Sequence, residues 1–395
     1  MTAGGLRIAP ILFLAGAACY ANAPPQSGTA PFVFDGNRVY AELSFLRPDG
    51  SLHPALAFVD SGSASMTITA SLARELALDR GRPLSFRVGE LNVTLPATEV
   101  IADPSPPYAV GSDLKVEAVL AASLLQRFEV VLDYRRHTLT LAEPGTIRPE
   151  GTATAFRVNP KTGLIAVDAS IDGRSYPVTI DTGSAYTWLR QDAVRTWLAA
   201  NPGWERGVGA VGASNMTMSG DGSEANGILL RIPRVLLGKL ALREVGALGV
   251  RGGRSPVDGV DLLDWYATKN AVPVIGWIGG NVLKSFRLTF DYEKNTLYWL
   301  AQREPDTHDL DQVGLTLKRE TGEFVVGAVA SKNEKPTVEG VLAGDRLVRI
   351  DGLETKGATW GRVYEALHGK PGDVRVLLLQ RGPDRITVRA SVTGF

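Results

Sequence analysis

Short apolar runs broken by glycine and proline fill most of this 395-residue chain. Val, Ile, Leu and Thr dominate these runs, and residues 138–141 and 296–300 alternate polar and apolar positions, as strands with one buried face do. Helical patterns are short. Residues 71–76 and 192–198 are each expected to form a helix that begins at its first residue, Ser71 or Asp192. The pattern predicts an all-β fold with a few short helices.

The first 23 residues have the pattern of an export signal. Arg7 provides a weakly positive start, residues 8–18 form an apolar core too short to span a bilayer, and residues 21–23 read Ala-Asn-Ala, which suits cleavage. We therefore expect an exported protein of the periplasm or cell envelope. A buried N-terminal helix is the alternative interpretation. Cys19, which follows two alanines, leaves a lipid anchor open.

Two segments of the chain have the same pattern. Residues 58–63 read Phe-Val-Asp-Ser-Gly-Ser, and residues 179–184 read Thr-Ile-Asp-Thr-Gly-Ser. Further along, residues 119–134 and 277–292 also correspond, and each ends in Asp-Tyr before a turn and an alternating strand. Several matches in the same order indicate a duplicated unit.

The second copy is longer than the first, and residues 252–272 account for part of the excess. This segment contains Pro256, Gly259 and a small apolar cluster that includes Trp265 and Tyr266. Two interpretations stay open: a surface loop that packs on itself, or an element that lines a substrate site.

Asp60 and Asp181 are the candidate catalytic residues. Two carboxylates held close together cannot both ionise, so such a pair shares one proton and can serve as acid and base toward a water molecule. A single Asp-Thr-Gly is usually a β-turn, but two copies in a duplicated unit favour chemistry. The residues expected to support the pair are those that follow each aspartate: Ser61, Gly62, Ser63, Thr182, Gly183 and Ser184.

These motifs resemble those of bilobal aspartic peptidases, with each copy closer in length to a retropepsin-like lobe than to a pepsin lobe. The resemblance implies two β-lobes, at residues 32–142 and 152–300. In that family each aspartate turn is held by an apolar-apolar-Gly segment that crosses beneath it, here residues 119–121 and 277–279. Ala121 stands where the family has glycine, which leaves the activity of the first lobe open.

The resemblance also implies roles for the residues of the two turns. Their glycines allow the backbone to turn tightly beside a carboxylate. The hydroxyls of Ser61 and Thr182 are expected to brace the turns against each other, and those of Ser63 and Ser184 to donate to the outer carboxylate oxygens. Such donors lower a carboxylate pKa. We therefore expect an aspartic endopeptidase that favours acidic to mildly acidic conditions.

Residues 310–395 resemble a PDZ domain of the bacterial protease-associated type. The resemblance is carried by a small turn, a strand and an Asp-Gly turn, then a helix and another strand: residues 340–352, 361–367 and 374–379. It implies a groove that binds a C-terminal peptide as an added strand. The groove residues would be Gly314, Leu315, Thr316 and Leu317. Thr316 replaces the family's second glycine, which leaves open whether this loop binds the carboxylate of a peptide. A unit that only packs on the two lobes and binds no peptide is the alternative.

Composition narrows the classes of partner. Lys and Arg number 42, as do Asp and Glu, so no basic excess suggests nucleic acid. Four scattered histidines and one cysteine give no metal-ligand spacing. We expect no metal or other cofactor, a protein or peptide substrate, and a monomer, because both aspartates lie in one chain. The alternatives are a non-catalytic peptide-binding protein and a cell-envelope scaffold.

Overall fold

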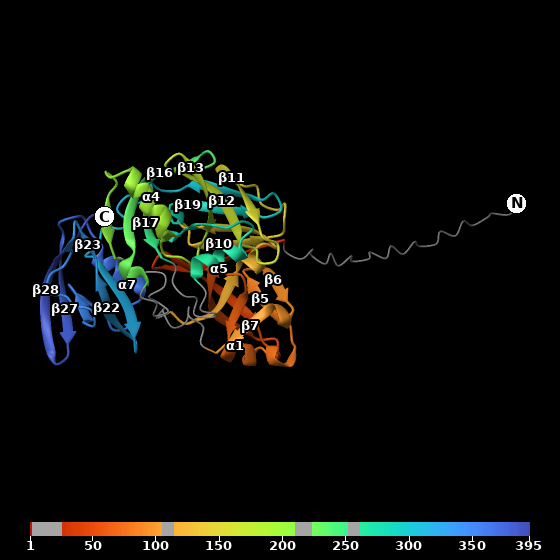
Figure 1. Ribbon diagram of the computed structural model, residues 1–395. Coiled ribbons are helices and arrows are strands. Elements are labelled where there is room, and N and C mark those ends of the chain that lie inside the picture. Colours follow the sequence, from red (N-terminus) through yellow and green to blue (C-terminus); the bar gives the residue numbers. More distant parts are fainter. Residues whose placement is uncertain (2–25, 105–113, 210–222, 252–260) are drawn as a thin grey trace.

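The computed structural model describes residues 1, 26–104, 114–209, 223–251 and 261–395 (Figure 1). The expected signal segment and Cys19 lie outside the described residues. Strands dominate, which confirms the mostly β class, and they form one large sheet system and one six-stranded sheet. Among the described helices, none has the length and apolar character needed to cross a membrane.

Residues 27–142 form the first part of the large sheet system. Its elements are β1 (Ser27–Asp35), β2 (Arg38–Leu46), β3 (Leu52–Asp60), β4 (Met66–Thr69), α1 (Ala70–Glu75), η1 (Leu78–Arg80), β5 (Leu84–Val88), β6 (Leu91–Leu95), η2 (Ala97–Glu99), β7 (Val100–Asp103), β8 (Val116–Ala121), α3 (Ala122–Leu125), β9 (Glu129–Asp133) and β10 (Thr138–Ala142). Strand β8 runs parallel to β3 and antiparallel to β4, so it lies between the strands on either side of the Asp60 turn.

Residues 152–301 repeat this arrangement. The elements are β11 (Thr152–Val158), β12 (Ile165–Ile171), β13 (Arg174–Ile180), β14 (Thr187–Arg190), α4 (Gln191–Ala200), β15 (Arg206–Val208), η4 (Ser223–Asn226), β16 (Ile228–Leu237), β17 (Leu240–Val250), α5 (Leu262–Lys269), β18 (Gly276–Ile278), α6 (Gly280–Leu283), β19 (Phe286–Asp291) and β20 (Thr296–Ala301). Here β18 runs parallel to β13 and antiparallel to β14, as β8 does in the first copy.

The helices α1 and α4 confirm the expected helices but start earlier than expected. Thr69, and not Ser71, caps α1, because its hydroxyl accepts the Leu72 N–H. Helix α4 begins at Gln191, so Asp192 lies in its first turn. Each helix therefore begins one residue before the start expected from the sequence, at Ala70 and Gln191, and its N-cap is one residue earlier still. The periodicity of apolar residues does not fix helix ends this closely.

The two copies join through one antiparallel sheet with strand order β1-β10-β9-β19-β20-β11. At its centre, β9 pairs with β19, with Thr289 opposite Val131. The repeated Asp-Tyr motif has a structural role here: Asp133 and Asp291 each accept a backbone N–H of the following turn, from Arg136 and Lys294, at 2.9 Å. This sheet fixes how the two aspartate turns face each other.

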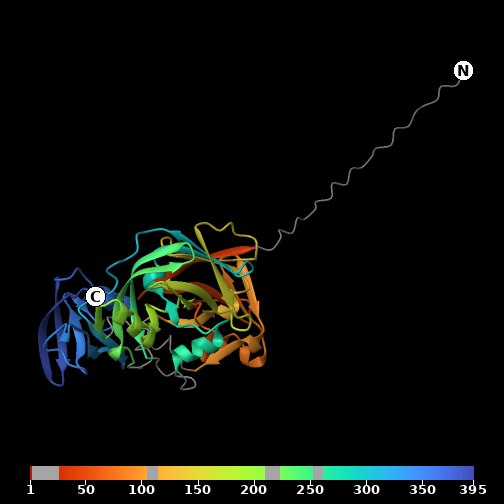
Figure 2. The same cartoon turned by 45° about the horizontal axis from the view of Figure 1, so that its top comes forward.

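The C-terminal residues form the six-stranded sheet, one helix and a short hairpin, β23–β24, which joins the large sheet system where Ser331 pairs with Val208 of β15. The elements are β21 (Leu315–Glu320), β22 (Glu323–Val329), β23 (Ser331–Lys332), β24 (Lys335–Pro336), β25 (Arg346–Ile350), β26 (Leu353–Glu354), α7 (Trp360–Leu367), β27 (Val374–Arg381) and β28 (Asp384–Ser391). In Figures 1 and 2 these blue elements lie to one side of the two copies. Trp360 of α7 packs edge-on against Phe324 of β22, with ring centroids 5.0 Å apart.

The C-terminal unit is packed against the second copy. A single hydrophobic cluster joins Tyr186 and Trp188 of the second copy to Tyr364 of α7. Beside it, the buried Arg231 guanidinium forms an ion pair with the buried Asp309 carboxylate at 3.0 Å, and Asn281 donates to the other Asp309 oxygen at 2.6 Å. Pairing and hydrogen bonding offset part of the cost of removing these two charges from water, and loss of either partner would leave the other charge buried and unpaired.

Candidate active site

The two candidate aspartates follow equivalent strands. Asp60 ends β3 and lies opposite Ala121 of the parallel strand β8. Asp181 follows β13, and its N–H donates to the Ile278 carbonyl of β18 at 3.0 Å. In each turn the glycine N–H returns to the aspartate: Gly62 donates to Asp60 Oδ1 and Gly183 to Asp181 Oδ1, both at 2.9 Å.

The structure brings the two carboxyls together across the boundary between the copies. A Cβ atom built on Gly62 would lie 2.5 Å from Asp181 Cγ, and one built on Gly183 would lie 2.5 Å from Asp60 Cγ. No side chain larger than hydrogen fits at these distances. The two glycines are therefore needed because each turn presses against the carboxyl of the other copy, in addition to the tight turn itself.

Ser61 and Thr182 hold the turns together by reciprocal hydrogen bonds. The Ser61 N–H donates to Thr182 Oγ1 at 3.0 Å, and the Thr182 N–H donates to Ser61 Oγ at 3.1 Å. Their hydroxyls then donate across the boundary to the carbonyls of Ile180 and Val59, both at 2.8 Å. All four groups are buried, so this network fixes the distance between the turns.

The expected role of Ser63 and Ser184 is wrong in this structure. The Ser184 hydroxyl donates to the Tyr186 carbonyl at 3.0 Å, and the Ser63 hydroxyl points to the Ser65 carbonyl at 3.4 Å. Each hydroxyl has one proton to donate, so neither supports a carboxylate in this way. A carbonyl two residues ahead is within easy reach of a serine side chain, and this local contact wins.

Tyr266 of α5 supplies the donor that the serines do not. Its hydroxyl donates to Asp181 Oδ2 at 3.0 Å and lies 2.6 Å from the position that a Cβ on Gly62 would take. The described part of the inserted segment, residues 261–272, therefore contacts a candidate catalytic residue directly. Neither of the two interpretations made from the sequence, a loop packed on itself or an element that lines the substrate site, includes this contact. The sequence pattern marked the apolar cluster around Tyr266, but no sequence signal shows this contact.

The environment of the pair favours one shared proton. Burial raises the pKa of the Asp60 carboxyl well above its ordinary value, and the neighbouring Asp181 charge raises it further, against the opposing Gly62 N–H. Burial also raises the pKa of Asp181, while the hydrogen bond from Tyr266 opposes that rise. Since the two carboxyls also hydrogen-bond each other, they titrate as a pair.

Arg38 is a second residue that the sequence pattern did not reveal. It is almost fully buried at the start of β2, its Nε donates to the Gly183 carbonyl at 3.0 Å, and its positive charge opposes the rise that burial causes in the pKa of both aspartates. A buried cation near the pair favours the singly ionised state over the fully protonated one.

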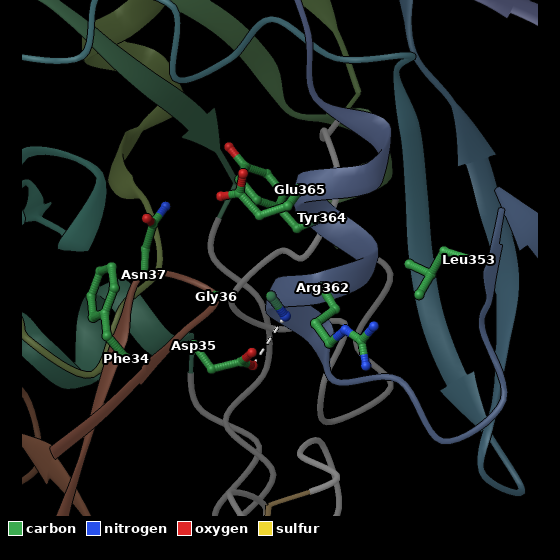
Figure 3. A pocket seen from close by; sticks show the side chains of 9 residues that line it. Phe34, Asp35, Gly36, Asn37, Leu353, Arg362, Tyr364 and Glu365 are labelled. Carbon is green, nitrogen blue, oxygen red and sulfur yellow. Dashed lines mark hydrogen bonds between the residues drawn. The ribbon is translucent and has the colours of Figure 1, made fainter. Parts of the chain in front are cut away.

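The turn that carries Arg38 also contacts the C-terminal unit. Asp35 points toward the first turn of α7, where it accepts the Gly361 N–H at 3.0 Å and a bond from the Thr359 hydroxyl (Figure 3). A negative charge at a helix N-terminus is favourable. Beside this contact lies a cavity of about 430 Å³, lined by Phe34 and Asn37 on one side and Arg362 and Glu365 on the other. Residues 35–38 thus contact both α7 and the turn that follows Asp181.

Ala121 fits its position. Its methyl group is fully buried in a small cluster with Tyr40, Phe58 and Val119. At the equivalent Gly279, a Cβ would lie 2.3 Å from the Tyr186 carbonyl oxygen. The two copies therefore differ in how closely the crossing segment approaches the chain above it, and the first copy accommodates the methyl without displacing the Asp60 turn.

The expected groove residues begin an edge strand of the C-terminal sheet. Leu315, Thr316 and Leu317 start β21 and are buried, and the Gly314 carbonyl accepts the Ala330 N–H at 2.7 Å. Just before them, the Val313 N–H donates to the Leu367 carbonyl at the end of α7. The segment therefore lies between the sheet and α7, far in sequence from the aspartates.

Across the described residues, no group of three or more His, Cys, Asp or Glu side chains is arranged to hold a metal ion. No protein-family model matches this chain, and no curated protein matches it in sequence. Inferences about function therefore rest on the geometry of the site.

Proposed function

We propose that this protein is an aspartic endopeptidase in which residues 32–142 and 152–300 are two lobes that share one active site. The observation that carries the proposal is the pair Asp60 and Asp181, held in hydrogen-bond contact by the reciprocal bonds of Ser61 and Thr182. Glycine is the one residue that fits at Gly62 and Gly183, which further supports a close carboxyl pair.

The chemistry of such a pair is hydrolysis by an activated water. The ionised carboxylate accepts a proton from water while the water oxygen bonds to the scissile carbonyl carbon, and the protonated carboxyl gives its proton to the carbonyl oxygen. The resulting tetrahedral diol collapses when the peptide nitrogen receives a proton and the C–N bond breaks. The pair then holds one proton again, so no metal, cofactor or covalent intermediate is required.

We propose that residues 310–395 act as a PDZ-like unit that recruits or orients a peptide. Strand β21 lies at one edge of the sheet order β21-β22-β25-β27-β28, and an edge strand can pair with an added peptide strand, which supports a groove along it. Residues Gly314, Leu315, Thr316 and Leu317 would line that groove.

The cellular setting is also a proposal. The signal-like first 23 residues support export to the periplasm or cell envelope, with a lipid anchor at Cys19 as a variant of the same idea. Because one chain carries both aspartates, a monomer has a complete site.

The test is cleavage of an unfolded protein mixture by the purified chain between about pH 3 and 8, the range over which carboxyl pairs titrate. Mapped products should show internal cuts, with a maximum below neutral pH, and Asp60→Asn and Asp181→Asn should both abolish them. Cleavage that survives either substitution would overturn the proposal. Peptide binding without cleavage, unchanged in both variants, would favour the peptide-binding alternative.

A further inference from the structure

The two aspartates receive different hydrogen bonds. Asp181 accepts the Gly183 N–H on Oδ1 and the Tyr266 hydroxyl on Oδ2. Within the part of the chain that the structure describes, Asp60 is bonded by the Gly62 N–H and by the Asp181 carboxyl itself. The otherwise symmetric pair is thus made asymmetric by one phenol from the insertion in the second copy.

Tyr266 is held firmly at this position. Its ring packs against Trp277 and Trp265, with centroids 4.9 and 5.1 Å away. Trp277 lies on β18, the strand that pairs with β13, so the phenol and the Asp181 turn rest on the same strands. The Trp277 indole N–H is fixed by the Tyr186 carbonyl at 3.0 Å.

The helix that carries Tyr266 is also anchored at both its start and its side. Asp261 accepts the N–H groups of Leu263 and Asp264, which caps α5. Arg190 of β14 forms an ion pair with Asp264 at 2.5 Å. These contacts hold the hydroxyl at a fixed place instead of leaving it to sample several rotamers.

We infer that Tyr266 is a positioning residue that keeps Asp181 as the ionised base and leaves the shared proton on Asp60. A phenol that donates to a carboxylate stabilises the ionised form of that carboxylate. Its own proton stays in place, because burial and the nearby Asp181 charge raise the pKa of Tyr266 well above its ordinary value. The Oδ2 atom of Asp181 keeps a second lone pair that can accept from the water.

The roles in hydrolysis then follow, and this part rests on the proposed function. Asp181 removes the proton from water, and Asp60 delivers its proton to the scissile carbonyl oxygen. The ionisation of the pair does not depend on whether a peptide is cut, so it can be tested separately.

The test is Tyr266→Phe, which removes one oxygen and keeps the ring. The hydrogen bond stabilises both the singly and the doubly ionised pair relative to the protonated pair. Its loss should therefore move the acidic limb of the pH–kcat/KM profile upward by about one to two pH units and leave the alkaline limb in place. At the plateau, KM should change little.

Tyr134→Phe is the matched control. Tyr134 is also buried, and its hydroxyl has no hydrogen-bond partner among the described residues, so removing that oxygen should move neither limb. A Tyr266→Phe profile with both limbs unchanged would overturn the inference, and so would a rise in kcat/KM at all pH values, because that result would mean that Tyr266 blocks the site.

A second readout is the titration of the aspartate carboxyl carbons by ¹³C NMR, with Asp60→Asn and Asp181→Asn to assign the two signals. In Tyr266→Phe the first ionisation of the pair should rise by about one to two pH units. This shift in a chain that cuts nothing would support the inference while the peptidase proposal fails. Cleavage with no shift would overturn the inference alone.

Discussion

Asp60→Asn should make the stability of the protein less sensitive to pH. In the unfolded chain both aspartates ionise near the ordinary value of about 3.9. In the folded chain burial and the Asp181 charge raise the pKa of Asp60, so the pair keeps one proton that the unfolded chain has released. The contribution of this proton to stability is therefore complete below about pH 4 and is lost as pH rises toward the folded pKa, by about 1.4 kcal/mol per pH unit.

Asparagine preserves the shape of Asp60 but carries no titrating proton. From about pH 4.5 upward, the free energy of unfolding of Asp60→Asn relative to the unaltered chain should increase by about 1.4 kcal/mol per pH unit, until the folded pair ionises. Guanidinium unfolding followed by tryptophan fluorescence suits the measurement, because Trp188 and Trp277 stack 5.0 Å apart beside Asp181.

The control is Asp168→Asn. Asp168 is exposed and paired with Arg157, which lowers its pKa, so it stays ionised in both states above about pH 4.5 and should leave the pH dependence unchanged. Parallel pH dependences for the unaltered chain and Asp60→Asn would refute the shared proton and the account of the site that depends on it.

Three further predictions follow from the contacts around the pair. Ser61→Ala leaves a buried N–H and a buried carbonyl without partners and should lower the free energy of unfolding by about 2–4 kcal/mol, as measured in urea. Gly183→Ala places a methyl group 2.5 Å from Asp60 Cγ and should abolish cleavage, while circular dichroism reports whether the fold survives. Asp35→Asn weakens the α7 cap by about 0.5–1 kcal/mol and should speed amide hydrogen exchange at Gly361, with Asp192→Asn on α4 as the comparison.

The pairing of Asp60 with Asp181 could be predicted from sequence because the signal is local and occurs twice. The Asp-Ser-Gly and Asp-Thr-Gly turns each need only neighbouring residues, and the repeated Asp-Tyr segments locate the sheet that joins the copies. The alternating residues 138–141 and 296–300 likewise predict β10 and β20, because one face of each strand is buried.

Tyr266, Arg38 and Ser184 could not be assigned in the same way. The contact between Tyr266 and Asp181 joins residues 85 positions apart and depends on how α5 packs against Trp277. Arg38 is the first residue of β2 after a hairpin turn, where an arginine is normally solvated, and the Gly183 turn of the second copy lies against it. The Ser184 hydroxyl bonds the carbonyl two residues ahead, and the sequence alone does not distinguish that acceptor from the carboxylate expected for it.

The most direct test of the central claim, that two carboxyls of one chain form the site, compares four samples at equal chain concentration. These are the unaltered chain, Asp60→Asn, Asp181→Asn and a one-to-one mixture of the two variants, each assayed for cleavage of an unfolded protein. If the site lies within one chain, only the unaltered chain should cleave, with a rate proportional to its concentration. Cleavage by either variant, or recovery of cleavage in the mixture, would contradict this claim.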